Sequence, residues 1–110
     1  QQENFIINLV HMQHKLITSR TQCYYCKGVL TDENRTKDHI WPKSKGGKLS
    51  RDNKVYACRR CNKSKGNSTL EEWLEQLKVL EKTKKNKKVW ENRLTVIGTF
   101  YSLIDQYKYK

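Results

Sequence analysis

Four cysteines are the residues of this chain whose type and spacing could most directly do chemistry. They form two Cys-x-x-Cys pairs, Cys23 with Cys26 and Cys58 with Cys61. A two-residue gap lets both thiolates of a tight turn point at one ion, and two such turns complete a tetrahedral sulfur site that suits zinc. Disulfides or free thiols are the alternatives, but disulfides are uncommon without a secretory context. The spacing therefore predicts a structural Zn²⁺ bound by all four cysteines.

A second group of polar residues stands between and just after the two cysteine pairs. In chain order these residues are Asp38, His39, Asn53, Asn62 and Lys65. Together with the run Asp-His-Ile-x-Pro, a Gly-Gly pair and Cys-x-x-Cys-Asn, their order and distances resemble the HNH endonuclease family. The resemblance covers residues 23–66 and follows the variant that has Asn at the third signature position.

The resemblance implies a fold and a set of roles. The implied fold is α+β, with a ββα-metal (His-Me finger) core around one catalytic divalent ion. The cysteine site would stabilise that core. Asp38 and Asn62 would bind that ion, Mg²⁺ or Mn²⁺, and His39 would be catalytic. Asn53 would tie the hairpin loop and fix the backbone around His39. The implied reaction is hydrolysis of DNA phosphodiester bonds, leaving a 5′-phosphate and a 3′-hydroxyl.

The chemistry of hydrolysis is consistent with these residue types. Water is a poor nucleophile until a base takes its proton, and histidine titrates nearest to neutral pH. A hard divalent ion prefers oxygen ligands, which the carboxylate of Asp38 and the amide of Asn62 can supply. Neighbouring residues on a strand point to opposite faces, so Asp38 and His39 need not crowd each other.

The charge balance points to a polyanionic partner. The chain carries 23 Lys and Arg against 11 Asp and Glu, a net charge of +12. Such an excess suggests a nucleic acid, DNA first with RNA as an open alternative, in preference to a merely solvated surface. The basic residues expected to contact it lie near the motif and are Lys43, Lys45, Lys48, Arg51, Arg59, Arg60 and Lys65.

Flanking helices are expected to position this centre. Apolar residues spaced by three or four predict an amphipathic helix over about 4–19 and two C-terminal helices over about 69–86 and 89–107. Ser68 and Glu71 fit a capping box at the start of the first of these two. The apolar stripes expected to be buried are Leu70, Trp73, Leu74, Leu77 and Leu80, then Trp90, Leu94, Ile97, Tyr101 and Ile104.

The central elements are shorter. Strands are expected over 37–41 and 54–57, with a short helix over about 62–65 before Gly66. The motif core spans 21–66, and the whole chain, 1–110, is expected to form one domain because of its length.

Other functions stay open at this point. The chain could be a zinc-stabilised nucleic-acid-binding module without catalysis, or an interaction domain built on a degenerate nuclease core. No run is apolar enough for a membrane span and no secretory signal is evident, which favours a cytoplasmic protein. The resemblance implies a bacterial or phage origin. A double-strand break would need a homodimer or two separate events, and specificity would need fusion to a recognition domain.

Overall fold

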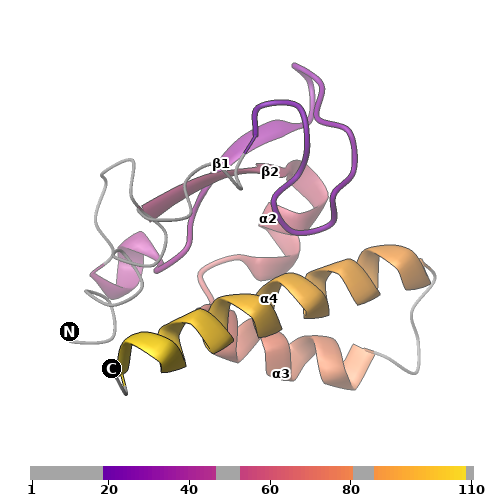
Figure 1. Ribbon diagram of the computed structural model, residues 1–110. Helices are drawn as coiled ribbons and strands as arrows, with labels where there is room; N and C mark the ends of the chain where they lie inside the picture. The colour runs from indigo at the N-terminus through magenta and orange to yellow at the C-terminus, as the bar shows by residue number, and fades with distance from the viewer. Residues whose placement is uncertain (1–18, 47–52, 81–85, 109–110) are drawn as a thin grey trace.

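The computed structural model describes residues 19–46, 53–80 and 86–108 (Figure 1). In these residues a two-stranded antiparallel hairpin is followed by three α-helices. The hairpin and α2 (Arg59–Lys65) form a ββα unit, which confirms the expected α+β fold. The expected helix over 4–19 lies outside the described residues, except for its last position.

The hairpin pairs β1 (Arg35–His39) with β2 (Lys54–Cys58). β1 begins and ends two residues earlier than the 37–41 expected. Its early start follows from pairing of Arg35 with Cys58. It ends early because the N–H of Trp41 donates to the side chain of Asn53, at 2.9 Å, instead of to a strand neighbour.

The two faces of the hairpin differ in burial. Asp38 on β1, and Val55 and Ala57 on β2, are buried, and α2 packs against both strands. The alternate positions, Lys37 and His39, are exposed and half-buried respectively. Side chains alternate along a strand, so Asp38 and His39 lie on opposite faces. The hairpin therefore presents one face to the core and the other outward.

Helix α2 begins earlier than expected, directly after β2. Cys58 is its N-cap, and the sulfur of Cys58 accepts a hydrogen bond from the N–H of Cys61 at 3.4 Å. The second cysteine pair is thus built into the first turn of a helix. The helix ends at Gly66, whose combination of φ 56° and ψ −134° is favourable only for glycine.

Helix α3 (Leu70–Leu80) has its capping box one residue later than expected. The N–H of Thr69 donates to Glu72 at 2.8 Å, and the N–H of Glu72 donates to the Thr69 hydroxyl at 3.2 Å. Thr69 and Glu72 therefore replace Ser68 and Glu71, since Thr69 is the residue that immediately precedes the helix. The helix buries Leu70, Trp73 and Leu77, while Leu80 is 47% exposed, contrary to expectation.

Helix α4 (Lys87–Lys108) lies antiparallel beside α3 (Figure 1). Of its expected stripe Ile97 is buried, and Trp90, Leu94 and Tyr101 are half-buried. Arg93 and Phe100, which the stripe did not include, are the other two buried residues of the helix among those described. The buried face is rotated toward Arg93 because that side chain is directed at the cysteines. No helix in the described ranges has the length and apolar character needed to cross a membrane.

Candidate functional site

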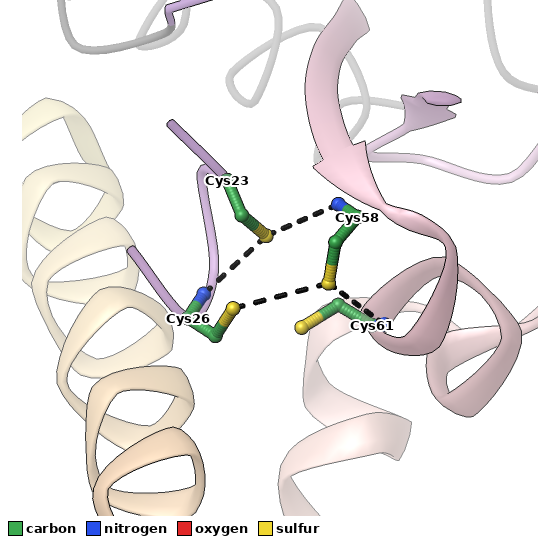
Figure 2. Close-up of side chains that lie close together, drawn as sticks. All are labelled: Cys23, Cys26, Cys58 and Cys61. Carbon is green, nitrogen blue, oxygen red and sulfur yellow. Dashed lines mark hydrogen bonds between the residues drawn. The ribbon is translucent and has the colours of Figure 1, made fainter. Parts of the chain in front are cut away.

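The four cysteines meet where the first turn of α2, which carries Cys58 and Cys61, faces the loop before β1, which carries Cys23 and Cys26. Figure 2 shows their sulfur atoms directed toward one another, and all four lie within 4.8 Å of each other. The sulfurs of Cys26 and Cys58 are 3.9 Å apart. Tetrahedral zinc with bonds of about 2.3 Å would space its sulfurs by about 3.8 Å. All four cysteines are buried and none forms a disulfide, so the disulfide alternative is wrong. The closeness of the four sulfurs means that the cluster can hold a metal such as zinc.

Backbone N–H groups surround the sulfurs. The N–H groups of Cys26 and Cys58 donate to the sulfur of Cys23, at 3.5 and 3.3 Å (Figure 2). The Cys61 thiol, together with these two N–H groups, lowers the pKa of Cys23 to about 4. The turn that aims the first pair has Lys27 in the left-handed region, with φ of 67°. These contacts favour the thiolate of Cys23, which is the form that binds metal, whereas burial raises the pKa of Cys26.

Helix α4 contributes two further contacts that sequence reasoning missed. The Nε of Arg93 donates to the sulfur of Cys61 at 3.2 Å, and the guanidinium lies 5.4 Å from the ring centre of Trp73. The amide of Asn92 donates to the carbonyl of Cys26 at 2.7 Å. A guanidinium beside a thiolate offsets the negative charge of the cluster. No motif could reveal these residues, since they lie more than thirty positions after the cysteines.

The carboxylate of Asp38 lies in a second, separate cluster. Asp38 is 4% exposed, and its Oδ2 accepts a 2.5 Å hydrogen bond from the hydroxyl of Tyr25. The Nζ of Lys65 lies 3.2 Å from the same oxygen. Burial raises the pKa of Asp38, while Lys65 and Tyr25 partly oppose the rise. Tyr25 stands inside the first Cys-x-x-Cys pair, so the cysteine turn also positions a partner of Asp38.

His39 ends β1 next to Asp38 and is half-buried. Its Nε2 is buried and has no hydrogen-bond partner among the described residues. Desolvation lowers the pKa of His39, and the nearby charge of Lys54, its cross-strand neighbour, lowers it further. The neutral imidazole can accept a proton at the atom that is left unpaired.

Asn62 hydrogen-bonds to Thr36, which lies on the same face of β1 as Asp38. The amide of Asn62 donates to the Thr36 hydroxyl at 2.9 Å, and Thr36 lies two residues before Asp38 on the same face of β1. The strand and α2 therefore direct a carboxylate and an amide to one side of the hairpin. A carboxylate and an amide oxygen are donors that fit a hard divalent ion. In this structure that carboxylate already contacts a cation, the ammonium of Lys65.

Asn53 braces the backbone beside His39. Asn53 is fully buried, its Oδ1 accepts from the N–H of Trp41, and its Nδ2 donates to the Trp41 carbonyl, both at 2.9 Å. The carbonyl of Asn53 also accepts from the N–H of Ile40 at 2.9 Å. This arrangement agrees with a bracing role and leaves the amide facing the backbone instead of a substrate.

The basic residues expected to contact nucleic acid fall into three groups. Lys43, Lys45, Arg59 and Arg60 are exposed, and Lys48 and Arg51 lie outside the described residues. Lys65 is 1% exposed, so the expectation that it contacts phosphate is wrong for this structure. Its ammonium is held by Asp38 and by the carbonyl of His39, at 2.9 Å, inside the ββα unit.

Comparison with known proteins agrees with this geometry. The model of the HNH endonuclease family matches residues 23–78, about half of the chain, so the chain belongs to the HNH endonuclease family. A similar protein is the CRISPR-associated endonuclease Cas9 of Corynebacterium diphtheriae, which is 43% identical over 53 residues. That match covers 47% of this chain and 5% of the length of the relative. The match thus supports a nuclease domain.

Proposed function

We propose that this chain is a metal-dependent endonuclease that hydrolyses DNA phosphodiester bonds, with His39 as the general base. Membership of the HNH endonuclease family supports the reaction class. The net charge of +12 supports a polyanionic substrate. The family chemistry would leave a 5′-phosphate and a 3′-hydroxyl. RNA remains an alternative substrate, because both nucleic acids carry the same phosphodiester linkage.

One observation carries the proposal, which is the buried Nε2 of His39 at the end of β1, next in sequence to Asp38 but on the opposite face of the strand. Asp38 and His39 are adjacent on the strand, and Asn62 reaches the Asp38 face through its 2.9 Å hydrogen bond to Thr36. The Nε2 of His39 is buried and without a partner among the described residues. A buried polar atom of this kind is normally paired, so an external partner such as water or phosphate would complete it.

The protein's own residues divide the work as follows. His39 takes a proton at Nε2 from the attacking water. Asn53 holds the backbone of the adjoining turn in place through Trp41. Asp38 and Asn62 would bind the divalent ion, which when bound neutralises charge on the phosphate and assists the leaving oxygen. We propose that the four cysteines bind a structural zinc, because their sulfur atoms already lie within 4.8 Å of one another.

Substrate contacts are proposed for the exposed basic residues. Lys43 and Lys45 lie on the short 3-10 helix that follows the strand of His39, and Arg59 and Arg60 begin α2. Lys43 and Lys45 follow the end of β1, whereas Arg59 and Arg60 follow the end of β2 at the opposite end of the antiparallel hairpin, and both pairs could contact the phosphate backbone. The relative carries its matching segment in a far longer chain, which supports fusion to a recognition domain. A homodimer is the other proposal for double-strand cleavage.

The proposal is tested with supercoiled plasmid, Mg²⁺, Mn²⁺ or EDTA, and separation of nicked from linear product. We expect wild-type protein to cut with either ion and not with EDTA. His39→Ala should lower the cleavage rate by at least about 100-fold, since a general base contributes on the order of 10²–10⁴. Glu75→Ala, an exposed change on α3, is the control that should leave the rate unchanged. Cleavage by His39→Ala at the wild-type rate would disprove the assignment.

A non-catalytic zinc module that binds nucleic acid is the second candidate. One observation favours it: the Asp38 carboxylate already has two partners, Tyr25 and Lys65. This candidate predicts DNA binding that is unaffected by EDTA at concentrations that leave zinc in place, and no cleavage with either ion. The plasmid assay and a parallel gel-shift measurement separate the two functions.

A further inference from the structure

The ion pair between Lys65 and Asp38 is the most deeply buried charge contact in the described part of the chain. The side chains of Lys65 and Asp38 are 0% and 4% exposed, and the Nζ atom lies 3.2 Å from Oδ2 and 3.5 Å from Oδ1. The same Nζ donates to the His39 carbonyl at 2.9 Å. The ammonium therefore contacts both carboxylate oxygens and the backbone of the next residue.

Any divalent ion bound by Asp38 must share this carboxylate with the ammonium. Mg²⁺ or Mn²⁺ lies about 2.1 Å from a carboxylate oxygen. The ammonium lies 3.2 Å from one oxygen and 3.5 Å from the other, so it leaves neither oxygen clear of positive charge. Two cations this close repel strongly where water is excluded. The hydroxyl of Tyr25 also donates a hydrogen bond to Oδ2, which leaves less space for an ion beside that oxygen.

We propose that Lys65 competes with the divalent ion for Asp38, and that this competition sets the metal affinity of the site. The inference rests on the proposed function, in which Asp38 is a metal ligand. Metal binding then requires the Lys65 ammonium to withdraw from the carboxylate. Because the same ammonium holds the His39 carbonyl, its withdrawal also frees the backbone at the end of β1. Lys65 is thus a positioning residue for the metal site and does not itself touch the reacting atoms.

The test is a Mn²⁺ titration of the full zinc-loaded chain without nucleic acid, in which free Mn²⁺ is measured by electron paramagnetic resonance. Lys65→Met removes the competing charge and retains a long side chain. We expect it to bind Mn²⁺ at least about tenfold more tightly than the wild type, since loss of a close like charge favours the ion. Lys63→Met is the matched control on the exposed side of the same helix, and its affinity should equal that of the wild type.

The test also covers the case in which Lys65→Met does not fold. Lys65→Met leaves a buried carboxylate without its cation, which destabilises the fold. If Lys65→Met unfolds, Mn²⁺ should restore its circular dichroism spectrum, since the ion replaces the lost charge. Failure of Mn²⁺ to restore the fold would overturn the inference. Lys65→Arg retains a cation and should bind Mn²⁺ no more tightly than the wild type.

Asp38→Asn separates failure of this inference from failure of the proposed function. Equal Mn²⁺ affinity in Lys65→Met and the wild type, with binding lost in Asp38→Asn, would overturn the competition and leave the proposed ligand in place. Unchanged binding in Asp38→Asn would remove Asp38 as a ligand and overturn both. Asp32→Asn makes the same change at a carboxylate whose side chain is 99% exposed and should have no effect.

Discussion

The cysteine cluster and the Asp38 cluster lie in the same ββα unit but are built on opposite principles. The cysteine cluster would concentrate negative charge once its thiols ionise: four sulfurs lie within 4.8 Å, with N–H donors and the Arg93 guanidinium around them. The Asp38 cluster has its charge already matched by Lys65. A site whose ligands repel one another requires an ion to be stable, whereas a charge-balanced site can be stable with or without one. The first arrangement suits a permanent metal and the second suits an exchangeable metal.

Tyr25 connects the two clusters. It stands between Cys23 and Cys26, is fully buried, and its hydroxyl donates to Asp38. Its ring packs edge-on against Trp73 at 5.0 Å. A change in the first cysteine pair should therefore reach Asp38 through this one side chain.

Cys58→Ser tests the cysteine cluster and should have the largest effect. It removes one metal ligand, while the serine hydroxyl can still cap α2. Binding of a structural zinc is worth on the order of 10 kcal/mol of folding free energy, so we expect loss of zinc and of cooperative unfolding. Zinc content by mass spectrometry of the metal and thermal melting by circular dichroism measure this. A zinc-free variant with a wild-type melting temperature would show that the cluster needs no ion.

Arg93→Met tests how far the charge of the cluster depends on α4. We expect zinc affinity to fall by about 10- to 100-fold, as for other groups that hydrogen-bond metal ligands. Competition with a chromogenic chelator measures the affinity. Arg60→Met, an exposed arginine next to Cys61, is the matched control and should keep wild-type affinity. If both variants lose zinc equally, the hydrogen bond to Cys61 is not the cause.

Tyr25→Phe sharpens the contrast by altering the Asp38 cluster alone. The hydroxyl donates to a charged carboxylate, and its loss should lower the free energy of unfolding by about 1.5 kcal/mol with zinc content unchanged. Urea denaturation measures the loss. Tyr56→Phe removes a hydroxyl that accepts a hydrogen bond from Arg20 on the exposed face, and it should have a smaller effect. A larger loss in Tyr56→Phe would contradict the importance assigned to the buried contact.

The sequence allowed the elements to be predicted wherever a local pattern defines them. The cysteine spacing, the ββα order and the two C-terminal helices were all predictable, because they depend on short-range periodicity and ligand geometry. The ends of elements were less accurate. β1 was placed two residues late and the cap of α3 one residue early, since Ser68 and Thr69 are both good caps and tertiary packing chooses between them.

The site was predictable only in part, for a related reason. Asp38, His39 and Asn62 belong to a motif that can be recognised along the chain. The contacts of Asp38 cannot be recognised in this way: Tyr25 precedes it by thirteen residues, and Lys65, although it is part of the motif, follows it by twenty-seven. A lysine beside a glycine usually lies at the surface, and nothing local indicates that Lys65 is buried against a carboxylate.

Helix α4 lies entirely beyond the region that matches the HNH endonuclease family, which ends at residue 78. Yet Arg93 and Asn92 contact the cysteine pairs, and Ile97 and Phe100 are part of the core. A chain shortened to the family boundary would expose Trp73 and leave Cys61 without its guanidinium. The unit that can be transplanted or fused to another protein is therefore longer than the unit that defines the family, and its minimum extends through Phe100.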